Sequence, residues 1–145
     1  MTHASRTDPL TPAARSAHMA KIRGAHTQPE RRVRSLLHRL GLRFRLQHAA
    51  LPGRPDIVLR RHATVVFVHG CFWHRHAAGA CKGATTPKTN QGFWLRKFRA
   101  NVRRDAGNQR DLRRAGWRVV VVWECELARP ERLAARLRRL FGVGP

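Results

Sequence analysis

Apolar residues recur along the chain at two different spacings, which separate the predicted helices from the predicted strands. Residues 27–40 carry apolar side chains at i, i+3, i+4 and i+7, the spacing of a helix with one buried face. These side chains are Val33, Leu36, Leu37 and Leu40. Thr27 and Glu30 have the spacing of a capping box at the start of this helix, and Gly41 is a typical helix end.

Beyond this helix the apolar residues alternate with polar ones or run together, as they do in strands. Residues 42–46 alternate apolar and basic side chains and predict a half-buried strand. Residues 56–59 and 64–68 are mostly apolar and are joined by a short basic turn, which predicts a hairpin. Residues 117–123 form a continuous apolar run, which is typical of a central buried strand.

Three further segments have the composition or spacing of helices. Residues 13–23 are basic and compatible with a helix, and residues 130–141 begin with a proline that suits a first helical turn. Residues 93–114 place four apolar side chains near one face, namely Phe93, Trp94, Phe98 and Val102. Residues 69–92, which are rich in His, Gly and Cys, predict a long loop.

The order of these elements predicts the fold class and the domain organisation. Helices and strands are interspersed without a strict repeat, which predicts an α/β protein with a mixed central sheet flanked by helices. A chain of 145 residues is long enough for one hydrophobic core. We expect a flexible N-terminal arm over residues 1–12, which are polar and contain two prolines, and a single domain over residues 13–145.

The strongly basic composition of the chain indicates what kind of molecule it binds. Lys and Arg number 30 against 8 Asp and Glu, which gives a formal net charge of +22 and favours nucleic acid as the partner. No apolar run of about 18 residues is present, so we expect no membrane-spanning helix. Because the start of the sequence lacks the apolar stretch of a secretory signal, we expect a cytoplasmic protein without a disulfide framework.

The three cysteines, Cys71, Cys81 and Cys125, are candidate zinc ligands. Zinc prefers four tetrahedral sulfur or nitrogen ligands, often paired by short loops. His74 and His76 lie between the first two cysteines, so either histidine completes a Cys₃His set. The alternative is three unrelated buried thiols. The spacing favours zinc but leaves the choice of histidine open.

Asp56 is a candidate ligand for a catalytic metal, since it begins an apolar strand directly after a proline. Mg²⁺ commonly takes one or two carboxylates beside substrate phosphate and water. Nucleases of the PD-(D/E)xK class add a second acid and a lysine from the neighbouring strand, and both are missing here. Asp56 alone is therefore better explained as a turn cap. His69 and His74, at the end of that neighbouring strand, change this interpretation because a histidine can replace the lysine as general base.

Aromatic residues provide the last candidate chemistry. Phe72 and Trp73 are adjacent in the polar loop, and Trp94 follows the segment Pro-Lys-Thr-Asn. Exposed aromatic side chains in a basic protein suit stacking on bases or insertion between base pairs. Core packing is an equal alternative for the first two. Core packing is favoured for Phe93, Trp117 and Trp123.

Several sequence blocks, in order, resemble the very-short-patch-repair (Vsr) endonucleases. They are LPGRPD at 51–56, VFVHGCFWHRH at 66–76, PKTN at 87–90 with FW at 93–94, NVRRD at 101–105 and GWRVVVVWEC at 116–125. The resemblance implies a restriction-endonuclease-like fold of the PD-(D/E)xK-related superfamily, with a structural zinc site. It also implies Mg²⁺-dependent nicking of DNA on the 5′ side of T in a T:G mismatch, the product of 5-methylcytosine deamination.

The resemblance assigns roles to individual residues. It implies that Asp56 and the backbone carbonyl of Val68 hold Mg²⁺, that His74 is the general base, and that His69 and Glu30 are accessory catalytic residues. The implied zinc ligands are Cys71, His76, Cys81 and Cys125. The spacing between the second and third of these ligands is longer than is usual in the family. The implied DNA-binding residues are Phe72, Trp73, Trp94, Met19, Lys88 and Asn90.

The implied substrate is double-stranded DNA with a T:G mismatch. As further partners the resemblance implies general mismatch-repair proteins and an associated cytosine-5 methyltransferase. We expect a monomer associated with the bacterial nucleoid. Two alternatives remain from the residues themselves: a nuclease of the same fold that acts on other DNA, in restriction or with a mobile element, and a zinc-stapled DNA-binding module without catalysis.

Overall fold

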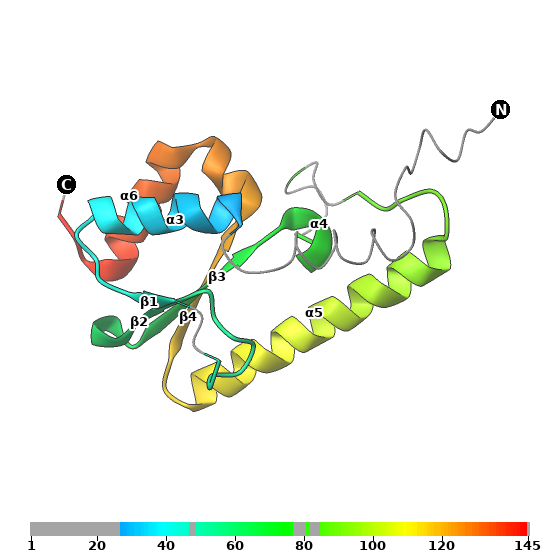
Figure 1. Ribbon diagram of the computed structural model, residues 1–145, viewed down its shortest axis with the longest axis horizontal. Coiled ribbons are helices and arrows are strands. Elements are labelled where there is room, and N and C mark those ends of the chain that lie inside the picture. Colours follow the sequence, from blue (N-terminus) through cyan, green and yellow to red (C-terminus); the bar gives the residue numbers. More distant parts are fainter. Residues whose placement is uncertain (1–26, 47–48, 77–80, 82–84, 145) are drawn as a thin grey trace.

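The computed structural model of the chain describes residues 27–46, 49–76, 81 and 85–144 (Figure 1). In chain order its elements are α3 (Gln28–Arg39), β1 (Arg45–Leu46), β2 (Ile57–Leu59), η1 (Arg60–His62), β3 (Thr64–His69), α4 (Cys71–His74), α5 (Gln91–Arg114), β4 (Arg118–Trp123), η2 (Glu124–Ala128) and α6 (Pro130–Phe141). The predicted arm over 1–12, the helix over 13–23 and Met19 lie outside the described residues. No helix of the described part is long and apolar enough to cross a membrane.

The strands form one mixed sheet in the order β1-β2-β3-β4. β1 and β2 are antiparallel, β2 and β3 form the predicted antiparallel hairpin, and β3 and β4 are parallel from Thr64↔Arg118 to His69↔Trp123. The expectation that residues 117–123 form a central strand is wrong, because β4 is the last of the four described strands. Its apolar run reflects helices on both faces of the sheet and not a central position.

Helices cover both faces of the sheet, α3 and α6 on one side and α5 on the other (Figure 1). A hydrophobic core lies on each face of the sheet, and alternate side chains of each strand pack into one core or the other, because successive strand residues point to opposite faces. Val66 packs with α3 and α6, whereas Val65 and Phe67 pack toward Leu112 of α5. The mixed α/β class and the flanking helices expected from the sequence are thus confirmed.

The first described helix begins at the predicted capping box. The Thr27 hydroxyl accepts the Glu30 N–H at 3.3 Å, while the Glu30 carboxylate accepts the Thr27 N–H at 3.5 Å. The apolar stripe of α3 packs into the core, where Val33 and Leu37 are fully buried. Each buried leucine or valine of this kind contributes about 1.5–3 kcal/mol of transfer free energy.

Three local expectations need correction. Residues 71–74 form the short helix α4 inside the predicted loop, and Arg75 ends it in a left-handed conformation with φ of 55°. Only Arg45 and Leu46 of the predicted strand 42–46 pair with β2, because Leu42 instead turns into the core below α3. Phe93, expected in the core, is 53% exposed near the start of α5.

Candidate active site

Three candidate catalytic residues, Asp56, His69 and His74, lie where β2 begins and where β3 ends. Asp56 directly precedes β2, and its Oδ2 accepts the N–H of Val68 at 2.7 Å. Burial raises the pKa of Asp56 from its ordinary 3.8 to about 7, against the effect of this hydrogen bond and with a smaller contribution from the charge of Glu30. The carboxylate therefore lies where its negative charge is poorly compensated by the protein alone.

His69 and His74 form a stacked pair beside this carboxylate. Their ring centroids are 3.8 Å apart and their planes differ by 5°. His69 is buried, and burial followed by the charge of His74 lowers its pKa to about 3. His69 is therefore a neutral ring at physiological pH, so the two stacked rings do not both carry a positive charge.

Asp105 of α5 holds the second histidine of the pair. The His74 Nδ1 and Asp105 Oδ2 atoms are 2.6 Å apart. Burial raises the pKa of Asp105, but the hydrogen bond and charge of His74 outweigh it, so the net pKa is lowered. An ionised carboxylate only accepts hydrogen bonds, so Nδ1 carries the proton and Nε2 is the nitrogen that can accept another.

Glu30 both caps a helix and lies near the candidate catalytic residues. It is buried at the start of α3, within the capping box, and pairs with Arg34 at 3.3 Å. Its charge also raises the pKa of Asp56, so the two carboxyl groups lie close enough to interact. The structure thus brings together Asp56, His69, His74 and Glu30.

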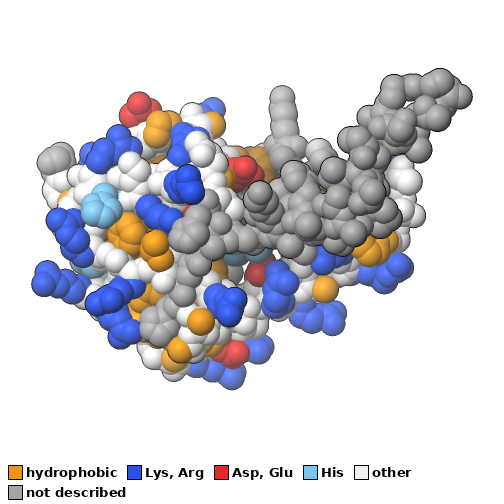
Figure 2. Space-filling model, in the orientation of Figure 1, with side chains coloured by type: hydrophobic (Ala, Val, Ile, Leu, Met, Phe, Trp, Pro, Cys, Tyr) orange, Lys and Arg blue, Asp and Glu red, His pale blue; other side chains and the backbone are white. Residues whose placement is uncertain are grey.

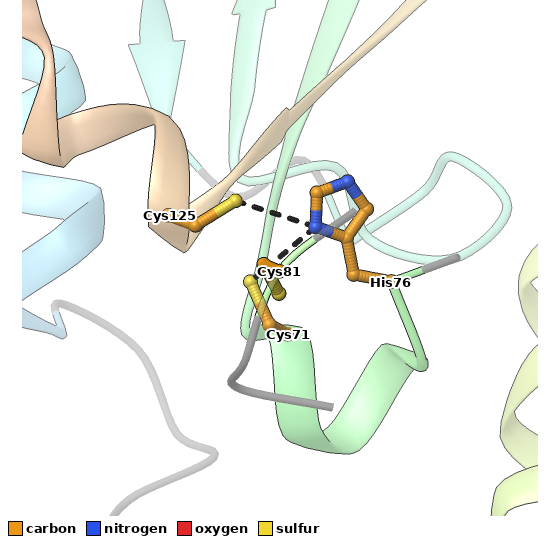
Figure 3. Close-up of side chains that lie close together, drawn as sticks. All are labelled: Cys71, His76, Cys81 and Cys125. Atoms are coloured by element: carbon orange, nitrogen blue, oxygen red, sulfur yellow. Dashed lines mark hydrogen bonds between the residues drawn. The ribbon is translucent and has the colours of Figure 1, made fainter. Parts of the chain in front are cut away.

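The three cysteines converge with His76 in a second group (Figure 3). One ligand atom from each of Cys71, His76, Cys81 and Cys125 lies within 4.8 Å of the others. The His76 Nδ1 faces two thiols, at 3.3 Å from the Cys125 Sγ and 3.7 Å from the Cys71 Sγ. Despite the long spacing before it, Cys81 belongs to the group.

The protonation of the thiols fits a site that needs a cation. Burial, the largest influence, raises the pKa of Cys71 to about 12 and also raises the pKa of Cys125. Thiolates crowded together in this way are unfavourable without a positive charge among them, and a soft divalent ion supplies that charge. The Cys/His set therefore can hold a metal ion.

The predicted DNA-binding aromatic residues lie in one cluster between α4 and the start of α5. Phe72 lies 4.9 Å from Trp73 and 5.7 Å from Trp94, and Trp73 and Trp94 are 5.9 Å apart between ring centroids. All three are half-buried. Lys88 and Asn90 are exposed just before α5, with Asn90 at a φ of 58°.

Residues to which the sequence blocks assigned no role complete the arrangement. The buried Asn101 donates from Nδ2 to the Trp73 carbonyl at 3.0 Å, and Asp105 lies one turn further along α5. Arg75 donates to the Phe72 and Thr85 carbonyls and lies 3.9 Å above the Phe98 ring. The chain has only 8 acidic residues, and this scarcity could have marked Asp105 as a candidate site residue.

Basic side chains are abundant on the surface of the molecule. Figure 2 shows Lys and Arg spread over the visible face with few acids among them. A hollow of about 420 Å³ beside α5 is lined by Arg75, Leu95, Phe98, Arg99, Val102 and Arg103. Fold and site together define a basic, mixed α/β protein with a Cys/His group suited to metal beside a carboxylate–histidine group.

Comparison with known proteins identifies the family. A family model of the DNA mismatch endonuclease Vsr matches residues 7–80. The type II nicking enzyme V.XorIIP of Xanthomonas oryzae pv. oryzae is 47% identical over 135 residues, which cover 93% of this chain and 97% of the relative. The DNA mismatch endonuclease Vsr of Escherichia coli is 46% identical over 121 residues, which cover 83% of this chain and 76% of the relative.

A further relative, the type II nicking enzyme V.NmeAIP of Neisseria meningitidis, is 44% identical over 92% of this chain and 94% of the relative. The chain belongs to the Vsr family of DNA endonucleases. The resemblance drawn from the sequence blocks is therefore confirmed, and the alternative of a DNA-binding module without catalysis is set aside.

Proposed function

We propose that this endonuclease nicks double-stranded DNA on the 5′ side of T in T:G mismatches, with Mg²⁺ as catalytic ion and zinc as structural ion. The observation that carries the proposal is the grouping of Asp56, His69, His74 and Asp105 in a chain 46% identical to a DNA mismatch endonuclease. We further propose a restriction-endonuclease-like fold in a single domain over residues 13–145.

Asp56 and the carbonyl of Val68 are the proposed ligands of Mg²⁺. Extension of the β2–β3 register places Pro55 opposite Val68, and proline has no N–H to donate to that carbonyl. The Val68 N–H on the same strand edge is taken by the Asp56 side chain instead. A hard cation prefers such carboxylate and carbonyl oxygens. When bound, Mg²⁺ supplies polarisation of the scissile phosphate and stabilises the charge of the leaving 3′ oxygen.

His74 is the proposed general base. The carboxylate of Asp105 holds the proton on Nδ1, so Nε2 is available to take the proton of the attacking water. The neutral His69 ring stacks against His74 and fixes its orientation. Glu30, whose charge acts on Asp56, is the proposed accessory acid at the edge of the site.

The Cys/His group is the proposed zinc site. Three thiols and one imidazole nitrogen are a usual ligand set for structural zinc. The ligands come from α4, from η2 and from two positions after α4, so a bound ion would link the end of β3 to the end of β4. Zinc is in this proposal a structural element with no step in the reaction.

The aromatic cluster is the proposed mismatch reader. Phe72, Trp73 and Trp94 are proposed to insert beside the T:G pair, where weaker pairing reduces the cost of unstacking. Lys88 and Asn90, and Met19 outside the described residues, are the proposed flanking contacts. We propose a cytoplasmic, nucleoid-associated monomer that works with mismatch-repair proteins and a cytosine-5 methyltransferase.

A nicking assay on end-labelled duplexes tests the function. We expect Mg²⁺-dependent cleavage of one strand, 5′ to T, with T:G duplex and little with the fully paired duplex. Asp56→Asn should abolish cleavage while retaining DNA binding. Asp105→Ala should lower kcat by about 10- to 100-fold at unchanged KM, because it removes the acceptor that orients His74. Equal nicking of paired and mismatched DNA would contradict the proposed specificity, and full activity of Asp56→Asn would contradict the proposed site.

A further inference from the structure

Four rings form a continuous row from the candidate general base to the Cys/His group. His74 stacks on His69 with centroids 3.8 Å apart. His69 meets the Trp123 ring edge-on at 5.2 Å and an interplanar angle of 76°. Trp123 in turn stacks on His76, with centroids 4.3 Å apart and planes within 11°. The indole of Trp123 therefore contacts one ring from each group.

The parallel pairing of β3 and β4 explains this arrangement. His69 and Trp123 are register partners at the last rung of the two strands, so their side chains emerge side by side on the face covered by α5. Two residues further along, each strand end contributes a cysteine of the Cys/His group, Cys71 and Cys125. The ring row and the cysteines are thus carried by the same two strand ends.

No helix or strand holds the His76 ring, so its position depends on its side-chain contacts. It follows the left-handed residue Arg75 and belongs to no helix or strand. Its Nδ1 contacts the thiols of Cys71 and Cys125, and its ring stacks on the indole of Trp123. A ligand bond from Nδ1 to a metal would fix this ring, and loss of the metal would release it from its plane against the indole.

We propose that Trp123 is a positioning residue that couples metal occupancy of the Cys/His group to the placement of His69 and His74. In this arrangement a metal-bound His76 holds the indole, the indole holds the His69 edge, and His69 holds the stacked His74. Loss of zinc then lowers the rate of strand cleavage through the ring row, in a protein that is still folded. The inference rests on the roles proposed above for zinc and for His74.

Replacement of Trp123 tests the coupling by two independent measurements. One is the rate of zinc release to a chelating dye, which needs no DNA, and the other is kcat and KM for nicking of T:G duplex. Trp123→Leu removes both ring contacts, so we expect zinc release to accelerate and kcat to fall, each by about tenfold or more, at nearly constant KM. Trp123→Phe keeps an aromatic ring, so its zinc release and its kcat should both lie closer to the wild-type values than those of Trp123→Leu.

Trp117→Leu is the matched control. Trp117 is also half-buried, lies directly before the same strand and packs into the core on the α5 face, but no histidine ring contact is described for it. Its replacement should lower the stability measured by urea unfolding and leave zinc release and kcat close to those of the wild type. If Trp117→Leu and Trp123→Leu alter zinc release and kcat equally, Trp123 acts only through general packing, and the proposal is overturned.

A double-mutant cycle separates coupling from two independent effects. Cys81→Ser weakens the Cys/His group and replaces none of the four rings of the row. We expect it to lower kcat in the wild-type background and to change kcat little further when Trp123 is already leucine, because the path to His74 is then broken. Additive losses overturn the coupling. If Trp123→Leu does not fold, the cycle with Trp123→Phe should show the same non-additivity at smaller size.

These outcomes also separate the coupling from the proposed function. Wild-type protein that binds zinc but does not prefer T:G duplex would contradict the function, and zinc release from the variants would still test the link between Trp123 and His76. Wild-type protein that nicks T:G duplex but shows the same zinc release in Trp123→Leu would contradict the coupling and leave the function intact.

Discussion

The position of Asp56 disfavours its ionised form in the folded protein but suits a metal ligand. It follows a proline and directly precedes β2, accepts the Val68 N–H and lies near the charge of Glu30. Burial raises its pKa to about 7, so the folded protein favours the protonated acid far more than the unfolded chain does. A bound divalent cation would reverse this preference, because it stabilises the carboxylate.

The raised pKa predicts how stability depends on pH in Mg²⁺-free buffer. As pH rises from the ordinary value of 3.8 to about 7, the unfolded chain ionises Asp56 before the folded protein does, and stability is lost across this window. Asp56→Asn removes that loss. Its urea unfolding should show a gain on the order of 1 kcal/mol or more over wild type at pH 8, and a smaller gain at pH 5.

Two measurements control this result. Asp111→Asn, at an exposed acid on α5, should show no comparable pH-dependent gain. Addition of Mg²⁺ at pH 8 should stabilise the wild type and leave Asp56→Asn unchanged. A gain in Asp56→Asn that is equal at both pH values would contradict a raised pKa at this position.

At the scale of elements, η2 carries Cys125 and is held by charged side chains. The Glu126 carboxylate accepts the Trp123 N–H at 2.9 Å and receives Arg136 of α6 at 2.9 and 2.8 Å. Arg136 also donates to the Val121 carbonyl at 3.0 Å. These bonds connect the end of β4 and its cysteine to α6, on the face opposite α5.

Loss of this connection should destabilise the turn at η2. Arg136→Met keeps the aliphatic packing of α6 but leaves the Glu126 carboxylate and the Val121 carbonyl without their partner. We expect a loss of about 1–2 kcal/mol in the free energy of unfolding, reduced from the buried-pair range because both side chains are partly exposed. Arg132→Met, at an exposed arginine of the same helix, is the control for urea unfolding and should change stability little. Equal losses in both variants would contradict the role of the bridge.

The elements also show what could be predicted from the sequence. Long periodic segments were found with small shifts of their ends, as in α3, the β2–β3 hairpin, α5 and α6. α4 was missed because four residues are too few to show a helical period. The position of β4 was missed because an apolar run records cover on both faces and not the number of neighbouring strands.

The candidate site was predictable where chemistry is concentrated in one segment. Asp56, His69 and the four Cys/His residues stood out by type and spacing, and the family resemblance selected His76 over His74 for the metal group. Asp105 and Trp123 come from α5 and β4, and their contacts with histidines depend on strand register and helix placement. Such long-range pairing leaves no periodic mark in the sequence.

At the scale of the whole molecule, the excess of basic residues should govern affinity for DNA, and the aromatic cluster should govern choice of site. Phosphate contacts release counterions whatever the base sequence, whereas insertion beside a weak pair depends on the bases. The aromatic cluster adjoins the hollow along α5 that Arg99 and Arg103 help to line. If DNA binds to the aromatic cluster, the DNA phosphate backbone would therefore lie against the α5 side of the protein.

Binding should weaken steeply with salt while discrimination between duplexes stays nearly constant. With several phosphates neutralised, we expect Kd to rise by roughly 10³-fold or more from 50 to 200 mM KCl, in parallel for T:G and paired duplexes. The double variant Arg99→Gln and Arg103→Gln should reduce the slope of log Kd against log salt. Arg39→Gln with Arg129→Gln, at exposed arginines of α3 and of the turn before α6, removes the same charge from the opposite face and should alter the slope less. Fluorescence anisotropy over a KCl series measures both slopes. Equal changes from the two pairs would mean that net charge, and not the α5 face, sets the affinity.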